Sequence, residues 1–441
     1  MGQRGARSIL LKRLAVLITI AAGLTVVTVL VFLQTNDPVL IVYWCVGSLV
    51  ILACLSAFLV GRRYTHLPVA AGRVLCIVPA YNEDPEGLVG TVRALLAQTV
   101  EVDIVVIDDG SRVPVVPSIE HPRLTWMRQD NTGKRGAQVT VLRGFDRDEY
   151  QFILTVDSDS EPFPDACEQL LRAMSNPSVQ AATGMIYIRN FADSWISRAA
   201  DMDIGTSCVM MRASRSMLGS LETTSGALAL YRSELLYDHL EAYAVECGTG
   251  DDRWLALRAL RRGEVVGVAE AGVVTDMPST FKGTYRQRLR WARSWWWMLP
   301  YVFRYLTPKQ MLSPAYGLLQ MALTPVFTIW IVASIIATHG DRLESHPLTV
   351  WAYFMVYLIV RFGTGALYLV GRPGQSRGEK LKSLAFGTPG AVLLNMVLLV
   401  PTRYWALGRL FDNRWHTREV VTVGKHIAPS AKRRTLVGAS R

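Results

Sequence analysis

The chain has 441 residues, half of which are hydrophobic, and its formal net charge is +11 at pH 7. This composition is too apolar for an ordinary soluble enzyme and indicates a membrane protein that carries a soluble domain. The basic excess is compatible with nucleic acid, anionic lipid or an anionic substrate, but the Lys and Arg residues flank hydrophobic stretches instead of forming one patch, which favours membrane orientation and no nucleic-acid partner.

Two hydrophobic stretches near the N-terminus, Leu14–Leu33 and Val39–Val60, are each long enough to cross a bilayer, which needs roughly 20 apolar residues. Basic residues precede the first stretch and no small-residue cleavage site follows it, so we expect a transmembrane hairpin over residues 1–62 instead of a removed signal peptide. The link Gln34–Asp37 carries no Lys or Arg and is expected outside, whereas the Arg pair after the second stretch returns the chain to the cytoplasm.

Residues 63–277 alternate strand-like and helix-like stretches without a membrane span, which predicts one α/β domain of ordinary size. The six cysteines include no C-x-x-C pair, and the seven histidines lack metal-ligand spacing. This pattern gives no disulfide framework and no zinc site, and it indicates a reducing, cytosolic environment for the domain.

Three acidic clusters lie in this domain beside apolar, strand-like runs. Ligands of an open α/β sheet bind beyond the carboxyl ends of its strands, so we expect the acids to meet at one site. Asp157 and Asp159 are two residues apart, so both point to one face of an extended segment, and such oxygen ligands suit Mg²⁺ or Mn²⁺ on a diphosphate. The clusters are Glu83 and Asp84 after Val74–Val78, Asp108 and Asp109 after Val102–Ile107, and Asp157 and Asp159 after Phe152–Val156.

A further acidic pair follows in Gly250-Asp251-Asp252. Asp251 is explained by its place in the first turn of a helix, where a carboxylate interacts favourably with the macrodipole. Asp252 is a candidate general base, because an acceptor hydroxyl must lose a proton to become a nucleophile.

Residues 278–312 are rich in both Arg and Trp, and a helix with that mixture lies well in the headgroup plane of a membrane. We therefore predict interfacial helices here. Interfacial anchoring explains Trp295–Trp297.

The remaining sequence predicts two further spans within residues 313–383, at Pro314–Ala337 and Leu348–Val370. Arg361 lies inside the second of these, where a charge must either face a polar cavity or extend to the membrane surface. The basic loop after this span is expected inside.

A last apolar stretch, Leu384–Leu407, is interrupted by proline, and one more crossing would put the basic tail outside. We therefore predict a re-entrant or interfacial segment over residues 384–411, four crossings in total, and a cytosolic loop and tail over residues 412–441.

The ordered motifs resemble those of processive, membrane-embedded family-2 glycosyltransferases, which include cellulose, chitin and hyaluronan synthases. Five motifs in order, with membrane spans on both sides, make this resemblance specific. The motifs are Glu83, Asp109, Asp157-x-Asp159, Gly250-Asp251-Asp252 and Gln287-x-x-Arg290-Trp291.

Local features are most similar to hyaluronan synthases and nodulation chitin-oligosaccharide synthases. The resemblance runs from Arg73 to Arg418, and the first two spans match only in being hydrophobic. His416 stands where that family has Gly, a change that affects the flexibility of the loop but not its charge. The matching segments are Gly133-Lys134-Arg135, Asp157-Ser158-Asp159-Ser160, Cys247 five residues before Asp252, Leu399-Val400-Pro401 and Trp415-His416-Thr417-Arg418.

The resemblance implies a cytosolic GT-A-type domain with a Rossmann-like sheet, inserted between transmembrane helices. Ala80, Tyr81 and Glu83 would line the uridine pocket. Asp109 would contact uracil or ribose, and Lys134 would contact the nucleotide.

The same resemblance implies roles for the later motifs. Asp157 would lie near the nucleotide or donor sugar, Asp159 would bind the metal on the diphosphate, and Asp252 would act as general base. The other residues would form an acceptor collar that helps to hold the diphosphate and a loop that closes over the nucleotide. The collar residues are Gln287, Arg290 and Trp291, and the loop residues are Thr417 and Arg418.

These features predict an inverting transferase of the plasma membrane that polymerises UDP-N-acetylglucosamine and UDP-glucuronate and exports the growing polysaccharide through the bilayer. Three alternatives stay open: a chitin-like or other β-glycan synthase with one donor, a transferase of single sugars to lipid, and a catalytically inactive glycan-binding protein. Intact Asp157, Asp159 and Asp252 argue against the last of these. The sequence gives neither the donor sugars nor the oligomeric state.

Overall fold

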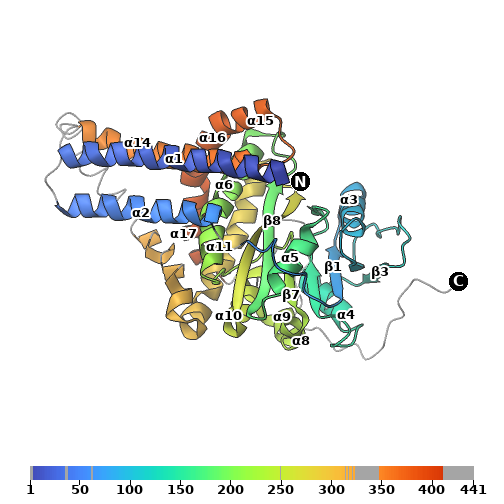
Figure 1. The fold of residues 1–441 in the computed structure, drawn as a ribbon. Coiled ribbons are helices and arrows are strands. Elements are labelled where there is room, and N and C mark those ends of the chain that lie inside the picture. Colours follow the sequence, from blue (N-terminus) through green and yellow to red (C-terminus); the bar gives the residue numbers. More distant parts are fainter. Residues whose placement is uncertain are drawn as a thin grey trace. The chain divides into compact units, whose positions relative to one another are not determined.

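The computed structural model describes residues 3–34, 38–60, 63–248, 250–312, 314–315, 317–319, 321–322 and 347–410. The chain divides into two compact units, and Figure 1 shows the fold in sequence colours. The first unit falls within residues 1–61, 202–217 and 307–389, and the second within residues 62–201, 218–306 and 390–441.

A mixed β-sheet forms the centre of the second unit. Among the described residues its strand order is β3-β2-β1-β4-β7-β6-β8-β5. Strands β3, β2, β1 and β4 are parallel, β7 runs antiparallel to β4 and β6, and β8 is parallel to β6 and antiparallel to β5. The strands are β1 Val74–Ala80, β2 Asp103–Asp109, β3 Leu124–Gln129, β4 Phe152–Thr155, β5 Glu161–Pro162, β6 Val179–Ile188, β7 Ala229–Arg232 and β8 Glu264–Thr275.

Helices cover this sheet, with α4 packed against β1 and β2 and α5 against β6 and β8 (Figure 1). The alternation of strands and helices confirms the predicted α/β class. The helices are α3 Pro85–Leu96, α4 Gly133–Leu142, α5 Ala166–Met174, α6 Trp195–Ser207 (which continues into the first unit), α8 Ser233–Tyr237, α9 Leu240–Glu246, α10 Asp251–Arg262 and α11 Phe281–Tyr305.

The unit β1–α3 shows how the local sequence produces these elements. All residues of β1 are buried, as expected for an apolar run in a parallel sheet that is covered on both faces. Asp84 then caps α3 by accepting a 2.9 Å hydrogen bond from the Gly87 amide, and Pro85 occupies the first helical position, where its missing N–H costs nothing.

The parallel register brings the acidic clusters to one edge of the sheet. Ala80, at the end of β1, pairs with Asp108 near the end of β2. Cys76 pairs with Leu154 of β4, so β4 also ends toward this edge. The expectation that the acids at or just after the ends of β1, β2 and β4 share one edge is therefore confirmed.

The first unit is helical, and within it α1 packs against both α14 and α2. The predicted spans Leu14–Leu33, Val39–Val60 and Leu348–Val370 are helices here, whereas most of Pro314–Ala337 lies outside the described residues. The helices are α1 Gln3–Gln34, α2 Pro38–Val60, η1 Cys208–Arg212, α7 Ala213–Met217 and α14 Pro347–Gly371.

A long helical segment ends the described chain. It runs through α15 Arg377–Lys382, η2 Ser383–Gly387, α16 Thr388–Leu394, η3 Asn395–Leu399 and α17 Val400–Trp405, and a short 3₁₀ turn, η4 Leu407–Arg409, follows. The segments η2 and η3 are π-helical.

By length and composition, two described helical segments could cross a membrane, Ser8–Leu33 and Arg377–Trp405. The predicted re-entrant or interfacial segment 384–411 falls largely within the second of them. Its path relative to the bilayer, like the four-crossing count, stays a prediction.

The position of Gly184 in β6 leaves no room for a side chain. A Cβ at this position would lie 2.3 Å from the Ala271 carbonyl oxygen and 2.8 Å from Leu228 Cδ2. We expect Gly184→Ala to lower the free energy of unfolding by about 1–3 kcal/mol, because neighbouring backbone must move. Unfolding of the purified protein, followed by tryptophan fluorescence, measures this loss. In the control Gly408→Ala the new Cβ meets nothing within 4 Å, and an equal loss there would contradict the steric explanation.

Candidate active site

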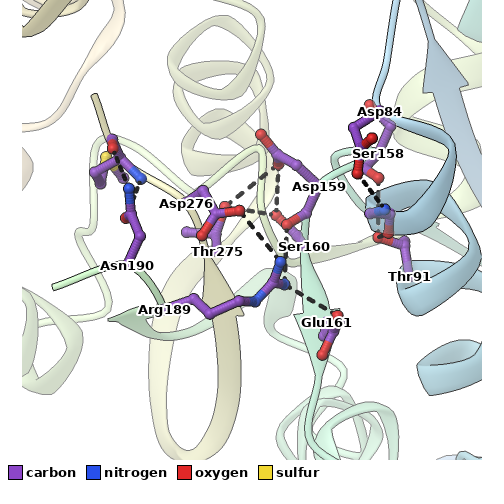
Figure 2. Close-up of polar contacts among 12 residues, drawn as sticks. Asp84, Thr91, Ser158, Asp159, Ser160, Glu161, Arg189, Asn190, Thr275 and Asp276 are labelled. Atoms are coloured by element: carbon purple, nitrogen blue, oxygen red, sulfur yellow. Dashed lines mark hydrogen bonds and ion pairs between the residues drawn. The ribbon is translucent and has the colours of Figure 1, made fainter. Parts of the chain in front are cut away.

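The Asp157–Asp159 motif follows β4 and lies in a dense polar network. Figure 2 shows Asp159 beside Ser160 and Thr275, whose hydroxyls both donate to Asp159 Oδ1, at 3.2 Å and 3.3 Å. The Ser158 hydroxyl donates to Glu83 Oε2, which ties the motif to the loop after β1. The structure therefore brings Glu83 and the two aspartates of the motif together, as the sequence predicted.

Arg189, which directly follows β6, contacts several residues of this network (Figure 2). Its guanidinium lies 3.2 Å from both Glu161 Oε1 and Asp276 Oδ2, and it donates to the Asp159 carbonyl oxygen at 3.3 Å. The pKa of Asp276 is raised, first by burial and then, against the lowering effect of Arg189, by repulsion from acids that include Glu161 and Glu83. This region therefore carries an excess of negative charge that attracts a cation.

The two acids at the end of β2 are both buried but have different partners. Asp108 accepts hydrogen bonds from the Ser111 and Val115 amides and pairs with Arg128, so it fixes the loop after β2. Asp109 is 2 % exposed and accepts from the Thr132 amide at 2.9 Å and from the Gln129 side chain at 2.7 Å. Burial raises the pKa of Asp109 despite these hydrogen bonds.

Lys134, near the start of α4, connects two parts of the site that are distant in sequence. Its ammonium nitrogen lies 2.7 Å from Asp157 Oδ1 and 3.1 Å from Asp251 Oδ2. Burial acts to lower the pKa of Lys134, but the two carboxylates outweigh it and raise that pKa. A Cβ on Gly226 would meet Asp157 Oδ2 at 2.8 Å and Lys134 Nζ at 3.0 Å, so a residue without a side chain is needed beside this ion pair.

The pKa values of the two adjacent acids at the start of α10 are shifted in opposite directions. Burial and repulsion from Asp251 raise the pKa of Asp252 to about 6, although Lys134 and Arg253 act in the opposite direction. Burial also acts to raise the pKa of Asp251, but the charges of Lys134 and Arg135 lower it overall. Asp251 is thus an ionised partner of Lys134 in the first turn of α10, and Asp252 can exchange a proton near neutral pH.

A second layer of contacts holds Asp252 in place. The Arg253 amide donates to Asp252 Oδ1 at 2.9 Å, and the Thr224 hydroxyl donates to the Asp252 carbonyl oxygen at 3.1 Å. Arg253 in turn forms a 3.0 Å ion pair with Glu222, and both side chains are largely buried. A Cβ on Gly250 would overlap the Ser294 hydroxyl, so the start of α10 packs directly on α11.

Helix α11 carries the predicted collar residues. Gln287 donates to Met277 Sδ at 3.4 Å, Trp291 is 39 % exposed, and the Arg288 guanidinium lies 4.7 Å from its ring centroid. Trp295 and Trp296 pack edge to face, and Trp296 donates to the Arg403 carbonyl oxygen at 2.7 Å.

The remaining predicted residues divide between the sheet edge, α11 and the undescribed tail. Ala80 is buried at the end of β1, Tyr81 is partly exposed in the loop that follows, and Arg290 is partly buried on α11. Thr417 and Arg418 lie outside the described residues.

Asp159 and its surroundings fit a divalent cation that is held mainly by substrate. Within the described ranges no three His, Cys, Asp or Glu side chains converge as a complete metal cage. Mg²⁺ usually takes one or two carboxylates, several waters and the phosphates of its substrate, and does not need such a cage. The oriented Asp159 carboxylate and the acidic surroundings of Asp276 suit that arrangement.

Residues 71–294 match the family described as Glycosyltransferase like family 2. The chain is 29% identical over 374 residues to the hyaluronan synthase of Streptococcus pyogenes, with 80% of this chain and 85% of that protein covered. It is 31% identical over 378 residues to the N-acetylglucosaminyltransferase of Sinorhizobium fredii, with 78% and 83% covered. Among solved structures it resembles the mannosyltransferase PcManGT from Pyrobaculum calidifontis in complex with GDP-Man and Mn²⁺, with a TM-score of 0.50 and 16% identity over 91% of this chain and 99% of that one.

The buried pair between Arg253 and Glu222 is expected to support both stability and the position of Asp252. Glu222→Gln removes the negative charge at nearly constant volume and leaves the buried guanidinium uncompensated, so we expect a loss of about 3–5 kcal/mol in the free energy of unfolding. Glu241→Gln is the matched control, since Glu241 is 80 % exposed in its pair with Arg143 and such pairs contribute little. Denaturant titration of both purified variants measures the difference, and equal effects would contradict the prediction.

Proposed function

Because the chain belongs to the family described as Glycosyltransferase like family 2, we propose that it is a membrane-embedded, processive, inverting β-glycosyltransferase that polymerises UDP-sugars and moves the polysaccharide across the membrane. The chain has the GT-A fold with its mixed α/β sheet and is a hexosyltransferase enzyme.

The observation that carries the proposal is the ionic connection from Asp157 through Lys134 to Asp251, with Asp252 next in sequence. It joins the edge of the sheet, where a nucleotide-sugar would bind, to a carboxylate whose pKa is about 6. A general base works best when its pKa lies near the operating pH. We assign this role to Asp252.

In the proposed reaction the acceptor hydroxyl gives its proton to the Asp252 carboxylate as its oxygen attacks the anomeric carbon of the donor. The new carbon–oxygen bond forms while the bond to UDP breaks, and attack from the opposite side inverts the configuration at that carbon. A Mg²⁺ or Mn²⁺ ion on Asp159, when bound, would neutralise charge on the leaving diphosphate. The structural neighbour that carries GDP-Man and Mn²⁺ supports this choice of cofactor.

Nucleotide binding is assigned to the loops at the sheet edge. Ala80, Tyr81 and Glu83 would surround the uridine, and Asp109 would contact its base or ribose. Lys134 would contact the nucleotide, because its ion pair with Asp157 holds it at this edge of the sheet.

The acceptor and the diphosphate are assigned to α11 and the tail. Gln287, Arg290 and Trp291 would hold the acceptor, because an exposed indole offers a flat apolar face to a sugar ring. Thr417 and Arg418 would close over the nucleotide.

The two relatives favour a polymer that contains N-acetylhexosamine. The hyaluronan synthase supports UDP-N-acetylglucosamine and UDP-glucuronate as alternating donors, and we take this as the leading product. The N-acetylglucosaminyltransferase supports the second candidate, a synthase that uses one donor. Transfer of one sugar to a lipid is the third.

For export, the hydrophobic segments that precede and follow the catalytic domain in the sequence would lie in the plasma membrane, and the catalytic domain would lie in the cytoplasm. Each unsatisfied polar group costs several kcal/mol in hydrocarbon, so a long glycan would need a polar path through the protein. The apolar segments Ser8–Leu33 and Arg377–Trp405 support membrane insertion.

The first test concerns the proton acceptor. Since Asp252 must be ionised to act as a base, kcat/KM should rise with pH and level off above pH 6, following the raised pKa of about 6. Asp252→Asn should lower kcat by roughly 100-fold or more while UDP affinity stays unchanged. A profile that is flat from pH 5 to 8, or an equal loss of UDP affinity, would assign Asp252 a structural role.

The second test concerns the metal. Asp159→Asn should abolish sugar transfer and weaken Mn²⁺-dependent UDP binding, measured by calorimetry, because the carboxylate that holds the ion is lost. Asp84→Asn is the control, since Asp84 caps α3 and Asn caps a helix equally well. Full activity of the unaltered protein in excess EDTA would rule out the metal.

The decisive test uses sealed vesicles with the catalytic domain facing outward and radiolabelled UDP-sugars supplied singly and in pairs. We expect polymer only with UDP-N-acetylglucosamine and UDP-glucuronate together, protected inside the vesicles from added hyaluronidase. Polymer from UDP-N-acetylglucosamine alone would favour the one-donor synthase. Product that stays outside, or a single sugar on lipid, would contradict coupled export.

A further inference from the structure

A cavity lined entirely by basic side chains lies away from the residues assigned to catalysis. Its volume is about 220 Å³, and the residues that line it are His239, Arg258, Arg261 and Arg262. Pockets for drug-sized ligands usually have roughly 300–1,000 Å³, so this arginine cavity suits a smaller group.

Aromatic rings contact the guanidinium groups of Arg258 and Arg261. Arg258 lies 3.2 Å from the centroid of the Trp254 ring and 4.8 Å from that of Tyr301 on α11. Arg261, one turn further along α10, lies 4.6 Å from the centroid of Tyr305. A guanidinium stacked on a ring can still present its planar N–H edge, which matches phosphate oxygens. Arg258 already uses part of that edge, in long hydrogen bonds to the Trp254 carbonyl oxygen (3.5 Å) and Glu246 (3.4 Å).

Negative charge near the cavity does not balance the arginines. Asp238 is shared, since it lies 2.7 Å from Arg262 and 2.6 Å from Arg147. Arg258 is 11 % exposed, and the carboxylate of its ion pair, Glu246, is 3.4 Å away and 62 % exposed.

Arg261 forms no ion pair in the part of the chain that the structure describes. Burial lowers the pKa of the Arg258 guanidinium against the raising effects of Tyr301, Glu246 and Cys247, and repulsion from Arg261 adds a smaller lowering effect. The excess of positive charge at the cavity therefore comes from Arg261, which has no carboxylate partner among the described residues.

His239 contributes a further polar atom to the cavity. Its Nδ1 lies 2.9 Å from the Leu235 carbonyl oxygen, and because a carbonyl only accepts, Nδ1 carries the proton of this hydrogen bond. Its ring packs edge to face on Trp254, with 6.0 Å between centroids, which fixes the ring plane.

The position of the arginines in the last turns of α10 has a simpler explanation, since cations there interact favourably with the helix macrodipole. That effect accounts for basic residues near a helix C-terminus. It does not require them to converge on one cavity, or to stack on rings of a neighbouring helix.

We propose that the arginine cavity binds a phosphate-bearing ligand, as free phosphate or diphosphate or as the headgroup of an anionic phospholipid. Arg258, Arg261 and Arg262 supply charge-assisted hydrogen bonds to its oxygens. The ligand neutralises the excess charge at the end of the helix that begins with Asp251 and Asp252. This site is separate from the donor site and does not depend on sugar transfer.

Equilibrium dialysis of the full chain in uncharged detergent, with EDTA and without UDP-sugar, tests the first source. The probes are ³²P-labelled phosphate and pyrophosphate. The double variant Arg261→Gln, Arg262→Gln should bind the anion roughly tenfold more weakly or worse, because it loses two charge-assisted contacts. Arg143→Gln, which changes an arginine outside the cavity, should bind like the unaltered chain.

A second arm tests the lipid headgroup, using micelles doped with phosphatidylglycerol or with phosphatidylcholine and native mass spectrometry to count retained lipid. Selective retention of phosphatidylglycerol that the double variant loses would identify a headgroup site, whereas loss only in dialysis would identify a free anion. The single variant Arg261→Gln should show the same loss in weaker form, and tryptophan fluorescence confirms that each variant is folded. Equal binding by the unaltered chain and the double variant in both arms would overturn the proposal.

Discussion

The ionic contact of Lys134 with Asp157 and Asp251 is the interaction on which the rest of the site depends. Without this cation, the half-exposed Asp157 carboxylate and the largely buried Asp251 carboxylate, which come from different parts of the chain, would lie close together with no opposite charge between them. Burial raises the pKa of Asp252, and repulsion from Asp251, which Lys134 keeps ionised, raises it further, to about 6. Lys134 itself acts against this shift, so the protonation of the proposed base depends on burial and on both charged neighbours.

The three residues of this contact come from distant parts of the chain, so the contact forms only when the domain is folded. Lys134 belongs to α4, Asp157 follows β4 and Asp251 begins α10, so three connections must be correct before the charges meet. The parallel order of β2, β1 and β4 places the first two elements, and the packing of Gly250 on Ser294 fixes the third. A glycine at position 226 then leaves room for the ion pair.

The sequence predicted the α/β class and the shared edge of the acidic clusters, because buried strands and the acids after them leave a local pattern. It did not predict Arg189, Glu222 or Gly226. Their roles depend on partners such as Glu161 and Arg253, and those partners are chosen by tertiary packing. The sequence also could not predict that the pKa values of Asp251 and Asp252 shift in opposite directions, since that difference depends on which carboxylate contacts Lys134. In the sequence, the arginines of α10 are explained by the C-terminal end of an ordinary helix. Their contacts with tyrosines of α11 are formed only in the folded chain.

The π-helical turns of the segment Arg377–Trp405 have a consequence for how this chain can vary. A π turn accommodates one residue more than an α turn, so deletion of a single residue within Asn395–Leu399 would allow ordinary α-helical hydrogen bonding. The turn would still close with one residue fewer, so the later side chains would keep their face of the helix. The Arg403 carbonyl would therefore stay directed at the Trp296 indole that donates to it. Related chains that lack this extra residue should present the same face of the helix to α11.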